Sequence, residues 1–171
     1  IGYNALSKNT GGQENVAVGA SALTMNSTGA FNVAIGTNAL GNAVGSGGNI
    51  GIGINSLRNL NGGGFFTHNV AIGTESQSDT TVAALSYYNT SVGPFSMQFN
   101  RSGIYNTGLG LSAMRTNDSS SYSTAVGADA MYFHKGTNGS NAAFGAFANR
   151  GDSTGFWNTA IGSEAMDRYG F

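Results

Sequence analysis

The sequence contains no cysteine, one proline and only two histidines among its 171 residues. The absence of cysteine excludes disulfide frameworks and thiolate metal sites. No apolar run approaches the roughly 18 residues that a membrane-spanning helix needs, so we expect no membrane insertion. Charged residues make up only 9%, and the formal net charge is -1. Proteins bind the phosphate backbone of nucleic acids through clusters of Lys and Arg. This sequence has only seven such residues, so we also expect no nucleic-acid partner.

Glycine, in contrast, is abundant, with 28 residues, and much of it belongs to a repeated five-residue motif. The motif begins with Asn, continues with an apolar, a small and a second apolar residue, and ends with Gly, as in Asn15-Val16-Ala17-Val18-Gly19. Subtracting successive motif-glycine positions gives spacings of 17, 17, 17, 20, 20, 17, 17, 18 and 17. The motif glycines are Gly2, Gly19, Gly36, Gly53, Gly73, Gly93, Gly110, Gly127, Gly145 and Gly162. Such a fixed period predicts a repeat architecture rather than one globular core.

The repeat predicts one coil of a parallel β-solenoid. Side chains alternate in size within the motif, which is the period of a β-strand. Most motifs are followed by a small-then-apolar pair such as Ala22-Leu23, with departures at Ser76-Gln77 and Ala148-Asn149, and then by a Gly/Asn/Ser/Thr-rich stretch typical of turns. Seventeen residues match no helical repeat class but suffice for two short strands and two turns. We therefore predict an all-β solenoid of about ten 17–20-residue coils, forming a single repeat domain over residues 1–171.

The alternation also predicts which side chains face inward. The fourth motif position is always large and apolar, so we expect Val18, Ile35, Ile52 and Ile72 to stack in a buried column. The third position never exceeds Ser in size, which would let a second backbone approach closely. We expect this column to form the contact between subunits of a homotrimer, because one thin, glycine-rich coil buries little apolar area for its lost entropy. The interface residues predicted in this way are Ala17, Ala34, Ala71, Ala125 and Ala160.

The motifs resemble two groups of fibrous proteins. The run Asn158 to Met166, Asn-Thr-Ala-Ile-Gly-Ser-Glu-Ala-Met, is similar to the repeats of phage tail fibres, and the motif also resembles the head repeats of trimeric autotransporter adhesins (YadA-like heads). The resemblance covers essentially the whole chain. It implies a left-handed β-roll, three chains about a fibre axis, an extracellular location on a virion or a bacterial surface, and a role in host attachment. Since the sequence begins in mid-motif at Ile1-Gly2, we interpret it as a fragment of a longer fibre protein.

Residues that carry catalysis are not arranged as a site. His68 and His134 occupy different repeat positions, and neither is accompanied by an acidic pair or a nucleophile motif. The aspartates share no column, unlike those of calcium-binding β-rolls. We predict that the chain is not an enzyme and that it uses no cofactor and no metal ion.

Aromatic residues are the better lead to a ligand. Phe31, Tyr88, Tyr105, Tyr122 and Trp157 stand just before the motif, and we interpret this column as part of the scaffold. Other aromatic and cationic residues break the pattern, and binding usually occurs where a loop departs from a rigid scaffold. Sugar rings stack on aromatic faces, so we expect a cell-surface glycan or protein receptor here; the alternative is that these residues only pack against a neighbouring chain. The candidate residues are Phe65, Phe66, His68, Tyr87, Tyr132, Phe133, His134 and Lys135.

Two further features bear on function. The two 20-residue repeats carry three extra residues each between Gly53 and Gly93, and we expect these residues to bulge outward because a coil has a fixed circumference. In or beside these insertions lie Phe65, Phe66, Val82, Leu85 and Tyr87. Separately, Thr90, Thr107 and Thr124 share a column, interrupted at Ala142, which leaves an ice-binding solenoid as an alternative of another class.

Overall fold

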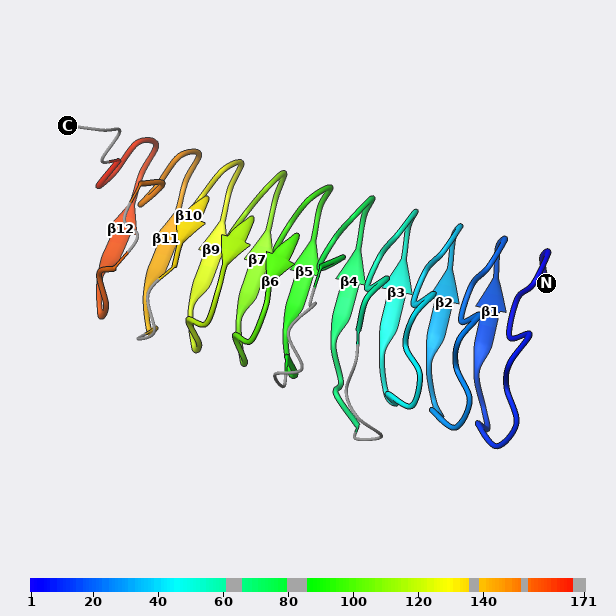
Figure 1. Cartoon of the computed structure of the whole chain (residues 1–171). Coiled ribbons are helices and arrows are strands. Elements are labelled where there is room, and N and C mark those ends of the chain that lie inside the picture. Colours follow the sequence, from blue (N-terminus) through cyan, green and yellow to red (C-terminus); the bar gives the residue numbers. More distant parts are fainter. Residues whose placement is uncertain (61–65, 80–85, 136–138, 152–153, 168–171) are drawn as a thin grey trace.

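The computed structural model describes residues 1–60, 66–79, 86–135, 139–151 and 154–167. Its nine longest strands form one parallel sheet in the order β1-β2-β3-β4-β5-β7-β9-β11-β12, so that each motif lies beside the next (Figure 1). These strands are β1 (Val16–Val18), β2 (Val33–Ile35), β3 (Ile50–Ile52), β4 (Val70–Ile72), β5 (Thr90–Val92), β7 (Thr107–Leu109), β9 (Thr124–Val126), β11 (Ala142–Phe144) and β12 (Thr159–Ile161). The prediction of a parallel β-solenoid is confirmed, with eight turns between the nine strands.

A second, shorter sheet lies on the wall of the solenoid that follows the small-then-apolar pair. It consists of β6 (Phe99–Asn100), β8 (Thr116–Asn117) and β10 (Phe133–His134), paired in parallel in the order β10-β8-β6. Figure 1 shows β1 and β12 at opposite ends of the resulting rod. Among the described residues there is no helix, and hence none that could cross a membrane.

The lengthened repeats keep the register of the long sheet. Ile50 pairs with Val70, and Val70 pairs with Thr90, although both steps span 20 residues. The extra residues therefore do not enter the strands, as the fixed circumference of a coil requires. Most of the insertions, including Phe65, Val82 and Leu85, lie outside the described residues.

The two faces of the long sheet are the reverse of those predicted. The small third position points into the coil, where Ala34 and Ala71 are fully buried among Leu23, Leu40 and Leu57. The fourth position points outward: Val18 is 39% exposed, Ile35 39% and Ile72 37%. The coil is too thin to hold a large side chain on each wall, so the bulky Leu or Met of one wall requires a small residue opposite.

The predicted interface column is therefore core, and the predicted core column is surface. The five alanines assigned to the contact between subunits pack inside one chain: Ala17, Ala34, Ala71, Ala125 and Ala160. Ile52, expected in a buried stack, is half-buried on the outward side of β3. The apolar interior consists instead mainly of these small residues and of the Leu, Met and Ala side chains of the pairs that follow most motif glycines.

The motif asparagine forms a hydrogen-bonded column through the interior. The backbone N–H of Asn49 donates to Oδ1 of Asn32 at 3.0 Å, and Asn49 Nδ2 donates to the same oxygen at 3.1 Å. The backbone N–H of Asn32 donates in the same way to Asn15 Oδ1 at 3.0 Å. A buried amide thus satisfies the backbone where each strand begins, which explains why Asn recurs at this position.

Candidate binding surfaces

The first candidate surface is the outward side of the long sheet, which we call the aliphatic face. It consists of the second and fourth motif positions, which alternate with the buried third position in every long strand. Its large exposed members are Val16, Val18, Ile35, Ile50, Ile72, Leu109, Phe144 and Ile161. Because the strands are in register, the fourth-position side chains form a continuous apolar column along the rod. The second-position column beside it is Val or Ile in β1 to β4 and mainly Thr in the later strands.

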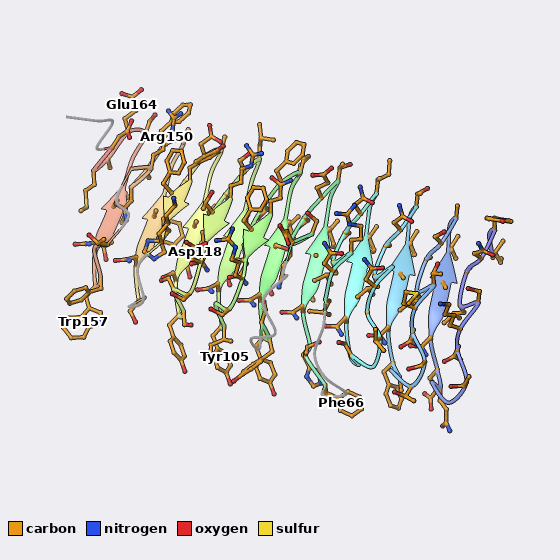
Figure 2. All side chains as sticks on the ribbon, in the orientation of Figure 1. Phe66, Tyr105, Asp118, Arg150, Trp157 and Glu164 are labelled. Atoms are coloured by element: carbon orange, nitrogen blue, oxygen red, sulfur yellow. The ribbon has the colours of Figure 1, made fainter. Side chains whose placement is uncertain are left out.

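The second candidate surface is a stack of rings along one edge, which we call the aromatic ladder: Phe31, Phe66, His68, Tyr88, Tyr105 and Tyr122. Ring centroids of Tyr88 and Tyr105 are 4.9 Å apart with an interplanar angle of 8°, and those of Tyr105 and Tyr122 are 5.1 Å apart at 13°. Phe66 and Tyr105 are seen on the same edge of the solenoid, which also carries Trp157 (Figure 2). The ladder repeats at the spacing of stacked strands.

Backbone geometry at this edge is unusual. The ladder residues Phe31, His68, Tyr88 and Tyr105 all have left-handed backbones, with φ of 61°, 49°, 58° and 56°. This conformation turns each side chain outward at the corner that leads into a strand. Neighbouring corners are held by backbone hydrogen bonds, such as Tyr122 N–H to the Ile104 carbonyl at 3.0 Å. The rings therefore stack because their corners do.

Stacking alters the tyrosine in the middle of the ladder. The pKa of the Tyr105 phenol is raised above its ordinary value of 10.0, first by desolvation among the neighbouring rings and then by the phenols of Tyr88, Tyr122 and Tyr87. Stacking also covers the ring faces. A sugar ring binds to an aromatic face, and Tyr105 has a tyrosine on each of its two faces. The middle of the ladder therefore offers ring edges and phenol groups rather than stacking platforms.

The structure separates the predicted ligand residues into two groups. Phe66 and His68 join the ladder, and Tyr87 lies edge-on to Tyr88 at 5.3 Å and 87°. Tyr132 and Phe133 lie instead on the wall of the short sheet, with ring centroids 4.5 Å apart. Lys135 is exposed, and Phe65 lies outside the described residues. The residues thus do not form one site.

His134 is not a surface ligand. Its side chain is fully buried, and Nε2 lies 2.6 Å from Ser120 Oγ and 3.3 Å from Asn141 Nδ2. It takes the repeat position that Asn117 occupies one coil earlier, as their pairing in the short sheet shows. His134 therefore forms hydrogen bonds inside the coil, and the prediction that it contacts a receptor is wrong.

A polar and aromatic cluster on the short-sheet wall was not recognised in the sequence. Arg115 donates from Nε to Gln98 Oε1 at 2.8 Å and from Nη1 to the Tyr132 hydroxyl at 2.6 Å. Its guanidinium also lies over the ring of Phe99, 5.8 Å from the centroid. Gln98 in turn donates to Glu75 at 2.5 Å. Gln98, Arg115 and Tyr132 share one repeat position, five residues after the motif glycine. Phe99 lies one residue after that position and Glu75 three residues before it, a signal visible only once the coils are aligned by their motif glycines.

An open polar depression of about 350 Å³ lies nearer the N-terminal end, on the same wall. Within it Asn42 Nδ2 donates to Asn59 Oδ1 at 2.7 Å. Its lining residues are Ser21, Thr24, Met25, Asn38, Gly41, Asn42, Arg58 and Asn59. The described residues contain no group of three or more His, Cys, Asp or Glu side chains that could hold a metal ion.

The chain was compared with protein families, curated proteins and solved structures. No family model matches it, and neither a curated protein nor a solved structure does.

Proposed function

We propose that this chain is a structural and receptor-attachment segment of a homotrimeric phage tail fibre, located outside the cell on the virion. The observation that carries the proposal is the aliphatic face. A large contiguous apolar surface on a protein marks an interaction site, because exposing it to water is costly. Here the apolar fourth position runs through all nine strands of the long sheet, and such a surface is what a long, rigid assembly would bury.

The occupant of the aliphatic face is two further copies of the same chain. Three parallel rods set side by side can turn their long sheets toward a common axis and bury all three faces together. Valine and isoleucine, prominent on this face, pack well against one another on pleated surfaces. The revised contact differs from the one expected from sequence: the outward second and fourth positions carry it, not the alanines of the third.

The attachment role draws on the surfaces that such an assembly leaves outside it. The aromatic ladder and the short-sheet wall lie off the aliphatic face and offer phenol, amide and guanidinium groups to a glycan or protein receptor. The head of a bacterial trimeric adhesin is the near alternative, since it shares the repeat motif. A membrane anchor in the parent gene would favour the adhesin, whereas a fused chaperone domain would favour the phage fibre.

An ice-binding solenoid remains a second candidate because its threonines do lie outward and in register. Thr90 pairs with Thr107, and Thr107 pairs with Thr124. The neighbouring outward column, however, is not threonine but Val92, Leu109 and Val126. A thermal hysteresis assay decides between the two classes.

Sedimentation velocity tests the assembly. We expect the unmodified chain to sediment as a trimer, and the double variant Ile35→Asp/Ile72→Asp to dissociate, because two buried carboxylates per chain would lack partners. The matched control is Thr28→Asp, at an exposed position outside the long sheet, which should leave the trimer intact. If the unmodified chain sediments as a stable monomer, the result contradicts the proposal. Attachment is tested separately, by binding of the labelled trimer to bacterial cells.

A further inference from the structure

The ladder position is the residue two positions before the first residue of each long strand. Two inner coils carry no ring at the ladder position, at Gly48 and at Ser140. At Gly48 the ring of Phe66 contacts both neighbours, Phe31 and His68, whereas no ring contact among the described residues bridges Tyr122 and Trp157 at Ser140.

The first residues of β9, β11 and β12 are Thr124, Ala142 and Thr159, which pair with one another in register. The ladder positions of these three coils are therefore Tyr122, Ser140 and Trp157. Ser140 has the left-handed backbone of the ladder, with φ of 66°, and its N–H donates to the Ser121 carbonyl at 2.9 Å. The corner is therefore built like its neighbours, but its side chain carries no ring.

The gap at Ser140 leaves ring faces open. Tyr88 and Tyr105, stacked on both sides, are 44% and 45% exposed, whereas Tyr122, stacked on one side, is 62% exposed. Trp157 is 79% exposed and precedes β12, the edge strand of the long sheet, so no described strand lies on its other side. Among the described residues Tyr105 is the only ring partner of Tyr122, and Phe156 the only one of Trp157. Phe156 meets Trp157 edge-on at 84°, as Tyr87 meets Tyr88 at 87° beside the ladder. The face of Tyr122 turned toward Ser140 is therefore a stacking surface, unlike the ring faces in the middle of the ladder.

The width of the gap selects one flat ring. Tyr122 and Trp157 are separated by two coils, or about 10 Å at the usual strand spacing. A ring in van der Waals contact needs about 3.5 to 4 Å on each side, so one ring fits between the two and a pair does not. The ladder itself shows the arrangement, with stacked centroids 4.9 to 5.4 Å apart. We call this space, bounded by Tyr122, Ser140 and Trp157, the ladder slot.

We propose that the ladder slot binds one pyranose ring whose hydroxyls are all equatorial, as in a β-linked glucose or N-acetylglucosamine unit. Such a ring presents axial C–H groups on both faces, and these meet the negative faces of Tyr122 and Trp157. Its hydroxyls lie at the rim, where the exposed Ser140 hydroxyl and water can bond them. An axial hydroxyl would place a polar group against one ring without a partner. This inference rests on the attachment function proposed above and assigns it a site.

The test uses Trp157, the single tryptophan of the chain, as its own reporter. The trimer is titrated with cellotetraose and chitotetraose, with β-1,4-mannotetraose as the mismatched probe because each of its units has an axial hydroxyl. We expect a saturable change in tryptophan fluorescence with the first two sugars and a much weaker response to the third. Ser140→Tyr completes the ladder and should lower the affinity by about tenfold or more, the scale of a lost stacking contact.

The matched control is Glu14→Tyr. Glu14 occupies the ladder position next to Phe31, with φ of 54°, so this variant adds a ring at the far end and should bind as the unmodified chain does. If Ser140→Tyr lowers the melting temperature, Tyr122→Leu serves instead, because it removes one wall and leaves the reporter in place. Saturation transfer from Trp157 protons to the sugar ring confirms that the response comes from contact.

Three results overturn the inference: no response to either sugar, an equal response in Ser140→Tyr, or a response to β-1,4-mannotetraose as strong as the response to cellotetraose. These results are separable from failure of the proposed function. If the trimer attaches to cells and Ser140→Tyr attaches equally well, the ladder slot is not the receptor site but the function stands. If the chain is monomeric or attaches to no cell, the function fails, and the sugar titration still judges the slot.

Discussion

At the scale of single residues, the fold depends on backbone conformations that side chains normally avoid. Leu23, Leu40 and Leu57 have φ of 51°, 52° and 50°, in the left-handed region where a non-glycine residue is disfavoured. Each is fully buried, and its N–H bonds the next coil, as Leu40 does to the Ser56 carbonyl at 2.9 Å. Packing and stacking therefore outweigh the local preference. Leucine and methionine are not turn residues by propensity, so nothing in the sequence indicates this conformation.

The motif glycine is required for a different reason, which gives the first residue-level prediction. Gly36 has φ of 130°, and a Cβ added there would lie 2.5 Å from the Gly53 carbonyl oxygen of the next coil. Since backbone cannot yield as a flexible side chain can, we expect Gly36→Ala to lower the free energy of unfolding by at least about 2 kcal/mol. Urea unfolding followed by circular dichroism measures it.

Gly11→Ala is the control for that substitution. Its added Cβ would meet only the Thr28 methyl carbon at 3.7 Å and the Ser27 carbonyl at 4.0 Å, which are ordinary contacts. We expect a change within about 0.5 kcal/mol, as for most surface substitutions. Equal losses at the two glycines would show that the close stacking of the motif glycines does not limit the fold.

At the scale of the strand, the asparagine column is the element that fixes where each strand begins. Asn49 Oδ1 accepts from the Thr67 hydroxyl at 2.7 Å and from the Asn69 N–H at 2.9 Å. Its Nδ2 donates to Asn32 Oδ1 at 3.1 Å and to the Gly47 carbonyl at 3.0 Å. Asn49→Leu preserves the size but leaves two buried donors, the Thr67 hydroxyl and the Asn69 N–H, without partners. Each costs about 1 to 3 kcal/mol, so we expect a loss of at least about 2 kcal/mol in chemical unfolding.

Asn42→Leu is the matched control for the strand-level prediction. Asn42 lies outside the asparagine column and is exposed. Its side chain donates one hydrogen bond to Asn59, in the next coil, at 2.7 Å. We expect a loss below about 1 kcal/mol, because water replaces that bond. If the two leucine variants unfold at the same urea concentration, the interior asparagines do not hold the strands in place.

At the scale of the whole molecule, the sequence predicted the stacking but not the side of the sheet that faces inward. The 17-residue period and the alternation in Asn32-Val33-Ala34-Ile35-Gly36 are enough to place the strands, their parallel order and their register. Alternation alone distinguishes two faces without orienting them. The orientation depends on the opposite wall of the coil, where Leu40 and its equivalents fill the narrow interior and leave room only for a small residue such as Ala. The ladder slot was equally hidden, because it is defined by the ring that Ser140 lacks.

A solenoid whose coils contact only their neighbours should tolerate the loss of one whole coil. Excising residues 20–36 joins Gly19 to Thr37 and removes 17 of 171 residues without changing the repeat position of any other residue. Stability in such arrays is a sum of coil and nearest-neighbour terms, so we expect a folded chain that is less stable. The denaturant m-value should fall by about a tenth, in proportion to the surface removed.

Excising only residues 20–28 deletes half a coil, which puts turn residues opposite strand residues. We expect that variant to lose cooperative unfolding, because the interior alanines and asparagines can no longer stack. If both excisions unfold cooperatively with the same midpoint, the coils are not the units that build this molecule, and register between them does not determine its stability.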